Sequence, residues 1–299
     1  MSNSNFPKAI VIVGPTASGK TGVAIELAQK YNGEIISADS RAIYKYMNLG
    51  TAKPTLEEQS LVPHHGIDLV EPDERFTAAD FKQYALEQIN NIRSRGKIPF
   101  LVGGTGLYID SVIFDYQFNE TTSPHTRTDL EQSSIKELIE YCQTNNILLP
   151  ENSKNKRYLI RAIETGGVVK NNRARIKKDF IVVGIATDKE ILRSRIATRA
   201  EQMFTDALVT ETNYLTARYG FHLESMKSNI YRVAARWITN EITLEQAKAE
   251  FIQLDLKLAK RQLTWFRRNP EIHWLPLAEI PAFVSCLFDE HKNDTINSI

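Results

Sequence analysis

The sequence predicts an α/β fold, in which a parallel sheet carries helices on both faces, with a helical insertion and a helical C-terminal part. Three observations support this prediction. Short apolar runs without polar alternation are typical of strands that are buried on both faces. Helical patterns separate these runs in the first third of the chain. From Glu190 to Arg268, nearly every segment has helical character.

The strands and helices of the core follow in order along the chain. The run Ala9–Val13 is a buried strand, and residues 22–31 form a helix with apolar residues on one side. Thr77 is a candidate N-cap for a helix that runs to Arg95. Further strands are expected at 34–37, 67–70, 98–102 and Phe180–Ala186.

The pattern changes after the first third of the chain. Residues 116–128 are polar and irregular, and 135–142 is one short helix. Thr243 and Gln246 have the spacing of a capping box that opens a long helix, which Asn269-Pro270 ends. We therefore expect a core in 1–114, a short helical insertion in 115–155, a continuation of the core with a basic segment in 156–189, a helical subdomain in 190–245, and a long helix with a last core strand in 246–299.

Composition excludes several classes of protein. With 42% hydrophobic and 24% charged residues in 299, the chain is not a disordered one. Its two cysteines, Cys142 and Cys286, belong to no metal-binding motif and cannot make a disulfide scaffold. The adjacent His64 and His65 point apart on a regular element, so we expect structural or hydrogen-bonding roles for them and not a shared metal ion.

The net charge of +1 creates no global field that would attract nucleic acid or an anionic membrane, so a nucleic-acid site must be local. We find no secretory leader and no run of apolar residues long enough to span a bilayer. We therefore expect a cytoplasmic protein without membrane contact.

The first strand runs into a phosphate-binding motif. The segment GPTASGKT fits G-x-x-x-x-G-K-[ST], with a strand before it and a helix after it. Its backbone N–H groups, the lysine charge and the helix N-terminus suit a phosphate or diphosphate, and the Thr21 hydroxyl is placed to bind Mg²⁺. An ordinary glycine-rich turn is the alternative. The predicted diphosphate-binding residues are Gly14, Pro15, Thr16, Ala17, Ser18, Gly19, Lys20 and Thr21.

Two further strand ends carry polar residues. Asp39 follows the second strand and can serve as a general base or act through Mg²⁺, although it could instead cap a following helix. The fourth strand runs into Gly103-Gly104-Thr105-Gly106, which permits close approach to a ligand, although a tight turn without a ligand is the alternative. Because ligands bind at the carboxyl ends of parallel strands, we expect all three loops to face one crevice.

Longer stretches resemble the tRNA dimethylallyltransferase family, also called tRNA isopentenyltransferase. They are GPTASGKT, EIISADSRAIYKYMNLGTAKP (34–54), VPHHGIDLVEPDERFTAADF (62–81), GKIPFLVGGTGLYI (96–109) and AKRQLTWFRRNPEIHWL (259–275). The resemblance implies a P-loop NTPase-like core that binds dimethylallyl diphosphate with Mg²⁺. The acceptor would be the exocyclic amine of the adenosine 3′ to the anticodon, flipped out of the anticodon stem-loop of tRNA. It also implies Asp39, Thr105 and Lys20 as catalytic residues, and we expect a monomer.

The resemblance also implies contacts with tRNA. From Lys154 to Lys178 there are nine basic residues, which can bind phosphates locally, although a solvated surface is the alternative: Lys154, Lys156, Arg157, Arg161, Lys170, Arg173, Arg175, Lys177 and Lys178. Near Trp265 and Phe266, which we expect to pack in the core, lie further basic residues. The implied tRNA-binding residues are Asp39, Ser40, Arg41, Ala42, Thr105, Arg127, Arg157, Arg161, Lys260 and Arg261.

Several positions depart from the family pattern, and they lie in the parts expected to face tRNA. Ala42 stands where the family usually has glutamine, and Tyr158 where arginine is common. The segments 230–233 and 255–256 and the short segment 115–155 also differ from the usual pattern. The diphosphate crevice is intact, so we expect altered RNA recognition before loss of the donor site.

Three other functions remain open at this point. An isopentenyltransferase acting on a free adenine nucleotide would not need the basic segment. A small-molecule kinase could use the same loop for ATP, but the first third lacks an arginine-rich lid. The third is a tRNA-binding protein without turnover; tRNA binding would survive Asp39→Ala in either case, but only an enzyme would lose modification.

Overall fold

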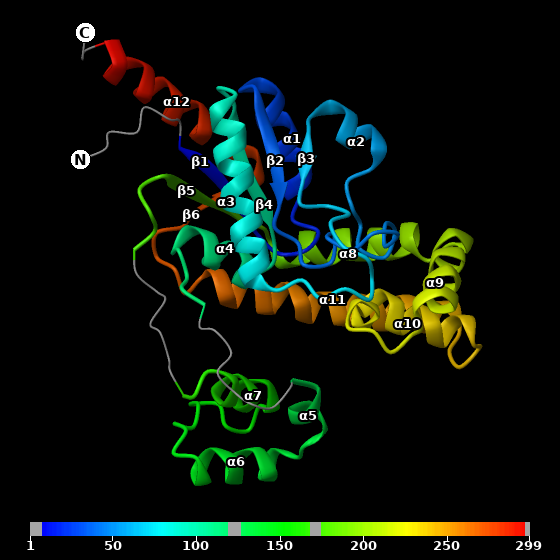
Figure 1. The fold of residues 1–299 in the computed structure, drawn as a ribbon. Coiled ribbons are helices and arrows are strands. Elements are labelled where there is room, and N and C mark those ends of the chain that lie inside the picture. Colours follow the sequence, from blue (N-terminus) through cyan, green and yellow to red (C-terminus); the bar gives the residue numbers. More distant parts are fainter. Residues whose placement is uncertain (1–7, 119–126, 168–174, 297–299) are drawn as a thin grey trace. The chain divides into compact units, whose positions relative to one another are not determined.

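The computed structural model describes residues 8–118, 127–167 and 175–296, which form two compact units (Figure 1). Unit 1 consists of the described residues of 1–113 and 176–299 and contains the sheet. Unit 2 consists of those in 114–175 and is helical.

The sheet of unit 1 is entirely parallel, as predicted. Its order is β3-β2-β4-β1-β5-β6, so β1 lies between β4 and β5 and pairs with both. This order brings the ends of β1, β2 and β4 to one edge, where ligands bind in open α/β sheets. The strands are β1 (Ala9–Val13), β2 (Gly33–Ser37), β3 (His64–His65), β4 (Ile98–Gly103), β5 (Phe180–Ala186) and β6 (His273–Pro276).

The strand predicted at 67–70 does not form. The strand at that edge of the sheet is β3, which pairs with Ile35 and Ile36 of β2. Asp68 adopts a left-handed backbone with φ of 52°, which an extended strand cannot contain. Its N–H donates instead to the carbonyl of Ala42, and Val70 makes an isolated parallel bridge with Tyr44. The segment therefore supports the loop after β2.

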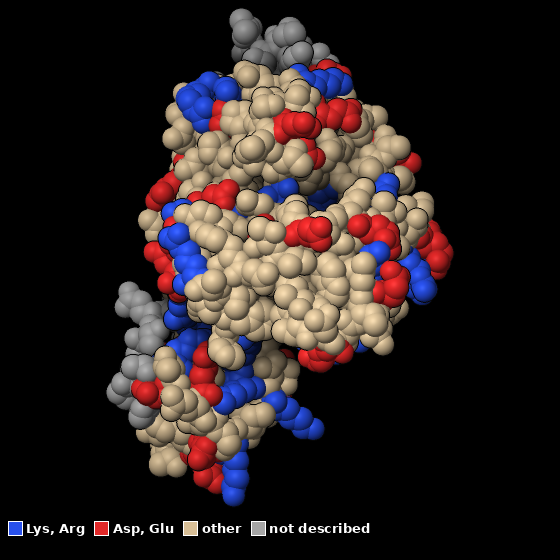
Figure 2. Space-filling model, turned by 90° about the vertical axis from the view of Figure 1, so that its right-hand side faces the viewer, with Lys and Arg blue, Asp and Glu red and all other residues tan. Residues whose placement is uncertain are grey.

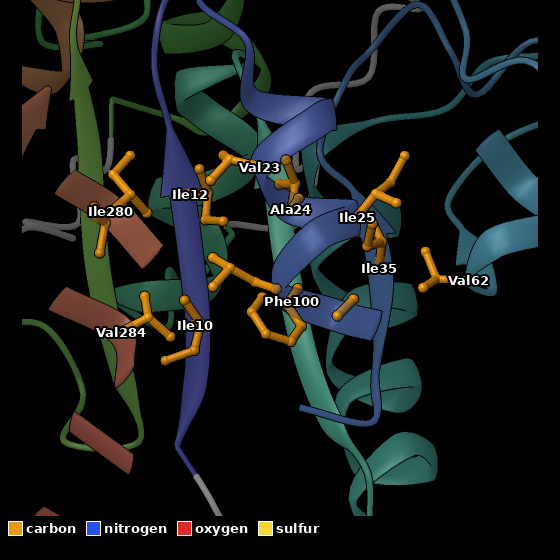
Figure 3. Packing of buried hydrophobic residues seen from close by; sticks show 14 of the residues in the cluster. Ile10, Ile12, Val23, Ala24, Ile25, Ile35, Val62, Phe100, Ile280 and Val284 are labelled. Carbon is orange, nitrogen blue, oxygen red and sulfur yellow. The ribbon is translucent and has the colours of Figure 1, made fainter. Parts of the chain in front are cut away.

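Apolar side chains alternate between the two faces of the sheet. On one face, Ile10, Ile12 and Phe100 pack under α1 (Lys20–Lys30) and α12 (Ile280–Ile296) (Figure 3). Each aliphatic side chain that is fully buried in this way stabilises the fold by about 1.5–3 kcal/mol. On the other face lie α3 (Ala78–Ser94) and α4 (Gly106–Ile113), where the rings of Phe81 and Tyr108 stack at 4.1 Å (Figure 1).

The predicted helix signals are confirmed in unit 1. Thr77 caps α3 and Thr243 caps α11 (Leu244–Phe266), each through a complete capping box. At 23 residues, α11 is about 34 Å long, and it packs against α8, α10 and α4. The remaining helices are α2 (Leu56–Leu61), α8 (Lys189–Met203), α9 (Asp206–Tyr219), α10 (Asn229–Ile238), and the short 3-10 turns η1 (Ser225–Lys227) and η2 (Leu277–Glu279). Across the described ranges, no helix is long and apolar enough to span a membrane.

Unit 2 packs three described helices around a small core of its own. They are α5 (Arg127–Gln132), α6 (Ile135–Thr144) and α7 (Lys156–Glu164), of which α6 was predicted from the sequence and α5 was not. The buried core residues include Leu138, Cys142 and Ile160. Leu130 of α5 joins this core, so tertiary packing supports a helix that is too short for a local signal.

Glu34 of β2 is a buried carboxylate with cationic partners, and it yields a stability prediction. Arg95 and Lys97 donate to it at 2.5–2.8 Å, and His65 forms a hydrogen bond of 2.7 Å with it. Burial alone would raise the pKa of Glu34, but these hydrogen bonds outweigh burial and lower it to about 2. We expect Glu34→Gln to destabilise the fold by about 3 kcal/mol in urea unfolding at neutral pH, since it leaves partly buried cations unpaired.

The sign of the pH dependence follows from this lowered pKa. The contribution of Glu34 is complete above its unfolded pKa of 4.5 and is lost as pH falls toward the folded value of about 2. The gap in unfolding free energy between wild type and Glu34→Gln should therefore shrink with acidification. Glu26→Gln, an exposed change on α1, is the matched control. A gap that stays constant with pH would contradict this account.

Candidate functional site

The predicted phosphate loop lies between β1 and α1. It turns through two left-handed residues, Ala17 with φ of 59° and Gly19 with φ of 93°. At Gly19 glycine is favoured, because residues with side chains rarely adopt a φ of 93°. The turn ends at the N-terminus of α1, where Lys20 is the first helical residue. The loop thus has the backbone shape and the helix dipole that bind phosphate.

Two buried donors at this loop have no protein partner. Ser18 Oγ and Arg199 Nε are buried, and neither has a hydrogen-bond partner within the described part of the chain. Buried polar groups are rarely left unpaired, so these donors indicate a site for an anion. Arg199 also donates through Nη1 to Thr16 Oγ1 at 2.8 Å, and Arg195 donates to the carbonyl of Ser18 at 3.1 Å.

Neither arginine was predicted as a site residue from the sequence. They come from α8, more than 170 residues beyond the loop that they contact. Arg195 and Arg199 are four residues apart, which places them on one face of that helix. This spacing is the signal that could have identified them.

Lys20 is the cation within the loop. Its Nζ donates to the carbonyl of Pro15 at 2.6 Å. Burial lowers the pKa of Lys20 from 10.5 to about 8, with Asp39 opposing this effect and Arg199 adding to it. In the ligand-free protein, Lys20 is therefore protonated in only about half of the molecules near pH 8.

This lowered pKa predicts how diphosphate affinity changes with pH. Only protonated Lys20 attracts an anion, so we expect affinity for pyrophosphate to fall above pH 8, by up to about tenfold per pH unit. Titration calorimetry on the ligand-free protein measures it. Lys20→Arg stays charged throughout and controls for other titrating groups. An equal fall in Lys20→Arg would assign the effect to a different group.

The ends of β2 and β4 meet beside this loop. Thr105 Oγ1 accepts a hydrogen bond from the N–H of Ser40 at 3.0 Å and lies 3.3 Å from Ser40 Oγ. Gly103 makes the close approach possible, because a Cβ there would lie 2.1 Å from the carbonyl oxygen of Ala38. The structure therefore brings Asp39, Ser40 and Thr105 together, as the strand-end argument expected.

Asp39 does not cap a helix, which was the structural alternative for it. The next helix, α2, begins only at Leu56. Asp39 Oδ1 accepts the N–H of Arg41 at 2.8 Å and so closes a local turn. Arg41 in turn donates through Nη1 to the carbonyl of Glu224 at 2.8 Å, which ties this turn to η1.

One cleft contains residues from all three strand ends. It encloses about 490 Å³, part of which is open to solvent. Figure 2 shows a hollow on the side of unit 1 where α2 and α9 lie, with Lys or Arg atoms inside it. The cleft is cationic at Lys20, carries a carboxylate and is otherwise lined by both polar and apolar residues. Its lining residues are Lys20, Thr21, Ala24, Ile35, Ser37, Asp39, Ala42, Thr51, Ala52, Pro54, His64, Val102 and Gly103.

Gln262 of α11, which was not predicted as a site residue from the sequence, connects two of the loops. Its Oε1 accepts the N–H of Thr16 at 2.8 Å, and its Nε2 donates to the carbonyl of Gly104 at 3.1 Å. One side chain thereby fixes the spacing between the phosphate loop and the glycine loop after β4. Its neighbours Lys260 and Arg261, which were predicted to bind tRNA, are exposed on the same helix.

The comparison with known protein families identifies the kind of site. The family model described as IPP transferase matches residues 42–269, and a second model, Isopentenyl transferase, matches residues 7–67. The first match covers more than half of the chain. The chain belongs to the IPP transferase family. The α/β fold with a P-loop NTPase-like core, predicted from sequence, is thereby confirmed.

Relatives of the IPP transferase family resemble this chain over nearly its whole length. A tRNA dimethylallyltransferase of Staphylococcus aureus is 38% identical over 291 residues, covering 91% of this chain and 94% of the relative. Two solved tRNA isopentenylpyrophosphate transferases are similar in structure. The one from Bacillus halodurans is 32% identical, with a TM-score of 0.73 and coverage of 96% and 98%. The one from Staphylococcus epidermidis is 33% identical, with a TM-score of 0.72 and coverage of 95% and 99%.

The arginines of unit 2 that were predicted to bind tRNA have protein partners. Arg127 donates to Glu164 Oε1 at 2.9 Å, and Arg161 donates to Glu164 Oε2 at 3.3 Å. Glu164 is buried, so the two arginines also neutralise a carboxylate inside the unit. Arg157 is exposed on α7. Lys170 and Arg173 of the basic segment lie outside the described residues.

The aromatic residues and histidines singled out in the sequence have structural contacts. Phe266 is buried in the core as expected, and Trp265 Nε1 donates to Asp110 at 2.9 Å. His64 and His65 do not share a partner, since His64 bonds to the carbonyl of Val62 and His65 bonds to Glu34. The expected hydrogen-bonding roles of the two histidines are therefore confirmed.

The positions that depart from the IPP transferase family pattern have defined surroundings. Ala42 is buried and lines the cleft. Asp255 is buried on α11 and accepts a hydrogen bond from Asn229 at 2.9 Å, and burial raises the pKa of its carboxyl. Tyr231, within the segment 230–233, is fully buried and donates to Glu211 at 2.6 Å.

Proposed function

We propose that this protein transfers a dimethylallyl group from dimethylallyl diphosphate to the exocyclic amine of the adenosine 3′ to the anticodon in tRNA, releasing pyrophosphate. The observation that carries the proposal is the cleft that holds Lys20 and Asp39 together. Within this cleft, Lys20 can bind the leaving diphosphate and Asp39 can act as the base for the incoming amine. The printed names of the relatives, tRNA dimethylallyltransferase and tRNA isopentenylpyrophosphate transferase, agree with this chemistry.

The donor side of the reaction rests on the phosphate loop. Breaking the allylic carbon–oxygen bond leaves negative charge on pyrophosphate, and Lys20 supplies the matching positive charge. Arg199 donates to Thr16 of the same loop and so places a second positive charge beside it. The apolar lining at Ala24, Ile35 and Val102 suits the five-carbon chain.

The chemistry of the cleft fits a magnesium ion. Thr21 and Asp39 both line it and offer hard oxygen atoms. Among the described residues, no group of three His, Cys, Asp or Glu side chains could hold a metal ion. Mg²⁺ suits such a sparse set, because it keeps several waters and binds phosphate oxygens. When bound through Thr21, it would neutralise charge on the diphosphate.

The acceptor side rests on Asp39. The exocyclic amine of adenine is a weak nucleophile, because its lone pair is delocalised into the ring. As its nitrogen forms the bond to the allylic carbon, Asp39 accepts the proton that the amine loses. Thr105 holds the backbone of Ser40 next to this carboxylate, which keeps Asp39 oriented. The adenine must leave the stack of the anticodon loop to enter the cleft.

Contacts with tRNA are assigned to the residues that the resemblance implies. Those near the cleft flank the target base, and the exposed cations on α7 and α11 contact the backbone phosphates of the anticodon stem-loop. We further propose that the protein is a cytoplasmic monomer. The assigned residues are Asp39, Ser40, Arg41, Ala42, Thr105, Arg127, Arg157, Arg161, Lys260 and Arg261.

The alternatives are less well supported. A free-nucleotide isopentenyltransferase or a small-molecule kinase would not share 38% identity with a tRNA dimethylallyltransferase over 91% of the chain. A protein that binds tRNA without turnover would not require Lys20 and Asp39 in one cleft.

One assay tests the proposal. The protein is incubated with labelled dimethylallyl diphosphate, Mg²⁺ and either unmodified tRNA or AMP, and the nucleosides are then analysed. We expect prenylated adenosine from tRNA and none from AMP. Label on AMP alone would favour the free-nucleotide enzyme, and no label on either substrate would overturn the assignment.

A further inference from the structure

One wall of the cleft is a loop with an unusual backbone. Thr51, Ala52 and Pro54 line the cleft from the segment after β2. Two non-glycine residues of this segment are left-handed, Tyr46 with φ of 63° and Ala52 with φ of 48°. Such conformations persist only where the surrounding structure imposes them. Something outside the loop must therefore hold it in place.

Glu211 of α9 provides that support. Its Oε2 accepts the N–H groups of Asn48 and Leu49, each at 2.9 Å, and its Oε1 accepts the N–H of Gly50 at 2.9 Å. Tyr231 donates its hydroxyl to the same Oε1 at 2.6 Å. A carboxylate can accept about four hydrogen bonds, so this one is fully used. The Glu211 side chain therefore holds three consecutive backbone amides of the loop.

Close packing and a second anchor reinforce the clamp. A Cβ on Gly50 would lie 2.3 Å from the ring of Tyr231, so the loop lies directly against α10 at this point. The other end of α9 reaches the same segment through Tyr219, which donates to Glu71, the partner of Lys45. Helices α9 and α10 therefore brace the loop at several points.

We propose that Glu211 is a positioning residue for the acceptor, acting through the loop that lines the cleft. Asp39 and Thr51–Ala52 lie at the two ends of one continuous segment, and both line the cleft. By holding the middle of this segment, Glu211 fixes the position of Thr51–Ala52 relative to Asp39. The inference rests on the proposed function, because the acceptor is the adenosine of tRNA. The donor grip at Lys20 and Arg199 receives no contact from Glu211, so binding of the diphosphate is independent of it.

Glutamine at position 211 tests this role without a change of size. Its amide NH₂ would face either the N–H groups of Asn48 and Leu49 or the N–H of Gly50 beside the Tyr231 hydroxyl, which can turn and accept. At least one of the four hydrogen bonds is therefore lost, and the negative charge that strengthens the others is removed. With unmodified tRNA and saturating donor, we expect Glu211→Gln to lower kcat/KM for tRNA about 10²-fold, the cost of a displacement near 1 Å. Pyrophosphate affinity without RNA should stay within about twofold of wild type.

Hydrogen exchange supplies a readout that does not depend on activity. The amides of 48–50 should exchange at least about tenfold faster in Glu211→Gln, while those of α1 are unchanged. Tyr231→Phe removes one of the four hydrogen bonds and should give a smaller effect in both assays. Glu241→Gln, which changes an exposed carboxylate paired with Arg236, is the matched control.

Each outcome bears on one claim. If wild type prenylates tRNA and Glu211→Gln does so equally well, the positioning role is overturned. If the amides of 48–50 exchange at the wild-type rate in Glu211→Gln, Glu211 does not hold the loop. If pyrophosphate affinity falls together with kcat/KM, the residue supports the whole fold rather than the acceptor wall. If wild type itself modifies no tRNA, the proposed function fails, while hydrogen exchange still tests the clamp.

Discussion

Replacing Asp39 by asparagine should lower kcat for tRNA prenylation about 10²–10⁴-fold, the range for loss of a general base. Asparagine can still accept the N–H of Arg41 through its side-chain oxygen, so the local turn is kept. It cannot accept the proton of the amine. Single-turnover assays with labelled dimethylallyl diphosphate measure the loss. The affinity for tRNA, measured separately, should change far less than kcat, because the asparagine oxygen can still accept a hydrogen bond from the target base.

The control for this variant is Asp73→Asn, an exposed aspartate in the same half of the chain. It should have wild-type activity. If Asp39→Asn turned over at the wild-type rate, Asp39 would not be the base, and only its role in the turn would remain.

The second large effect is expected from Lys20→Met. Methionine keeps the length of the side chain but removes the charge opposite the leaving pyrophosphate. We expect kcat to fall about 10²–10³-fold, as for the loss of one electrostatic donor, and the KM of the donor to rise. Initial rates at varied donor concentration separate the two effects.

Unfolding would not explain such a loss. Burial disfavours the charge on Lys20, as its lowered pKa shows, so the ligand-free Lys20→Met protein should melt no lower than wild type. Lys30→Met, at the exposed end of the same helix, should retain full activity. A Lys20→Met enzyme with normal kcat would show that other groups stabilise the leaving diphosphate.

The sequence was sufficient to predict the strands and loops whose conformation depends mainly on neighbouring residues in the chain. Ala9–Val13 and Phe180–Ala186 are uninterrupted apolar runs, and both are central strands of the sheet. The phosphate loop follows from its motif. The strand expected at 67–70 failed because Asp68 turns left-handed, a property that depends on its contact with Ala42.

The parts of the site that sequence reasoning missed depend on contacts distant in sequence. Gln262 reaches Thr16 across 246 residues, and Arg199 reaches it across 183. Periodic patterns of polar and apolar residues report only on neighbours along the chain, so they cannot predict contacts between residues this far apart. Lys260 and Arg261 were predicted as tRNA contacts from their charge, whereas the neutral amide of Gln262, which joins two loops of the site, carries no such local signal.

The shared carboxylate of unit 2 has a consequence for ionic strength. Arg127 and Arg161 both contact Glu164, so one negative charge already balances one of the two guanidinium groups. Such a cluster displaces fewer condensed cations from a nucleic-acid backbone than two isolated arginines would. The tally of basic residues in this stretch therefore overstates how steeply tRNA affinity declines with added salt.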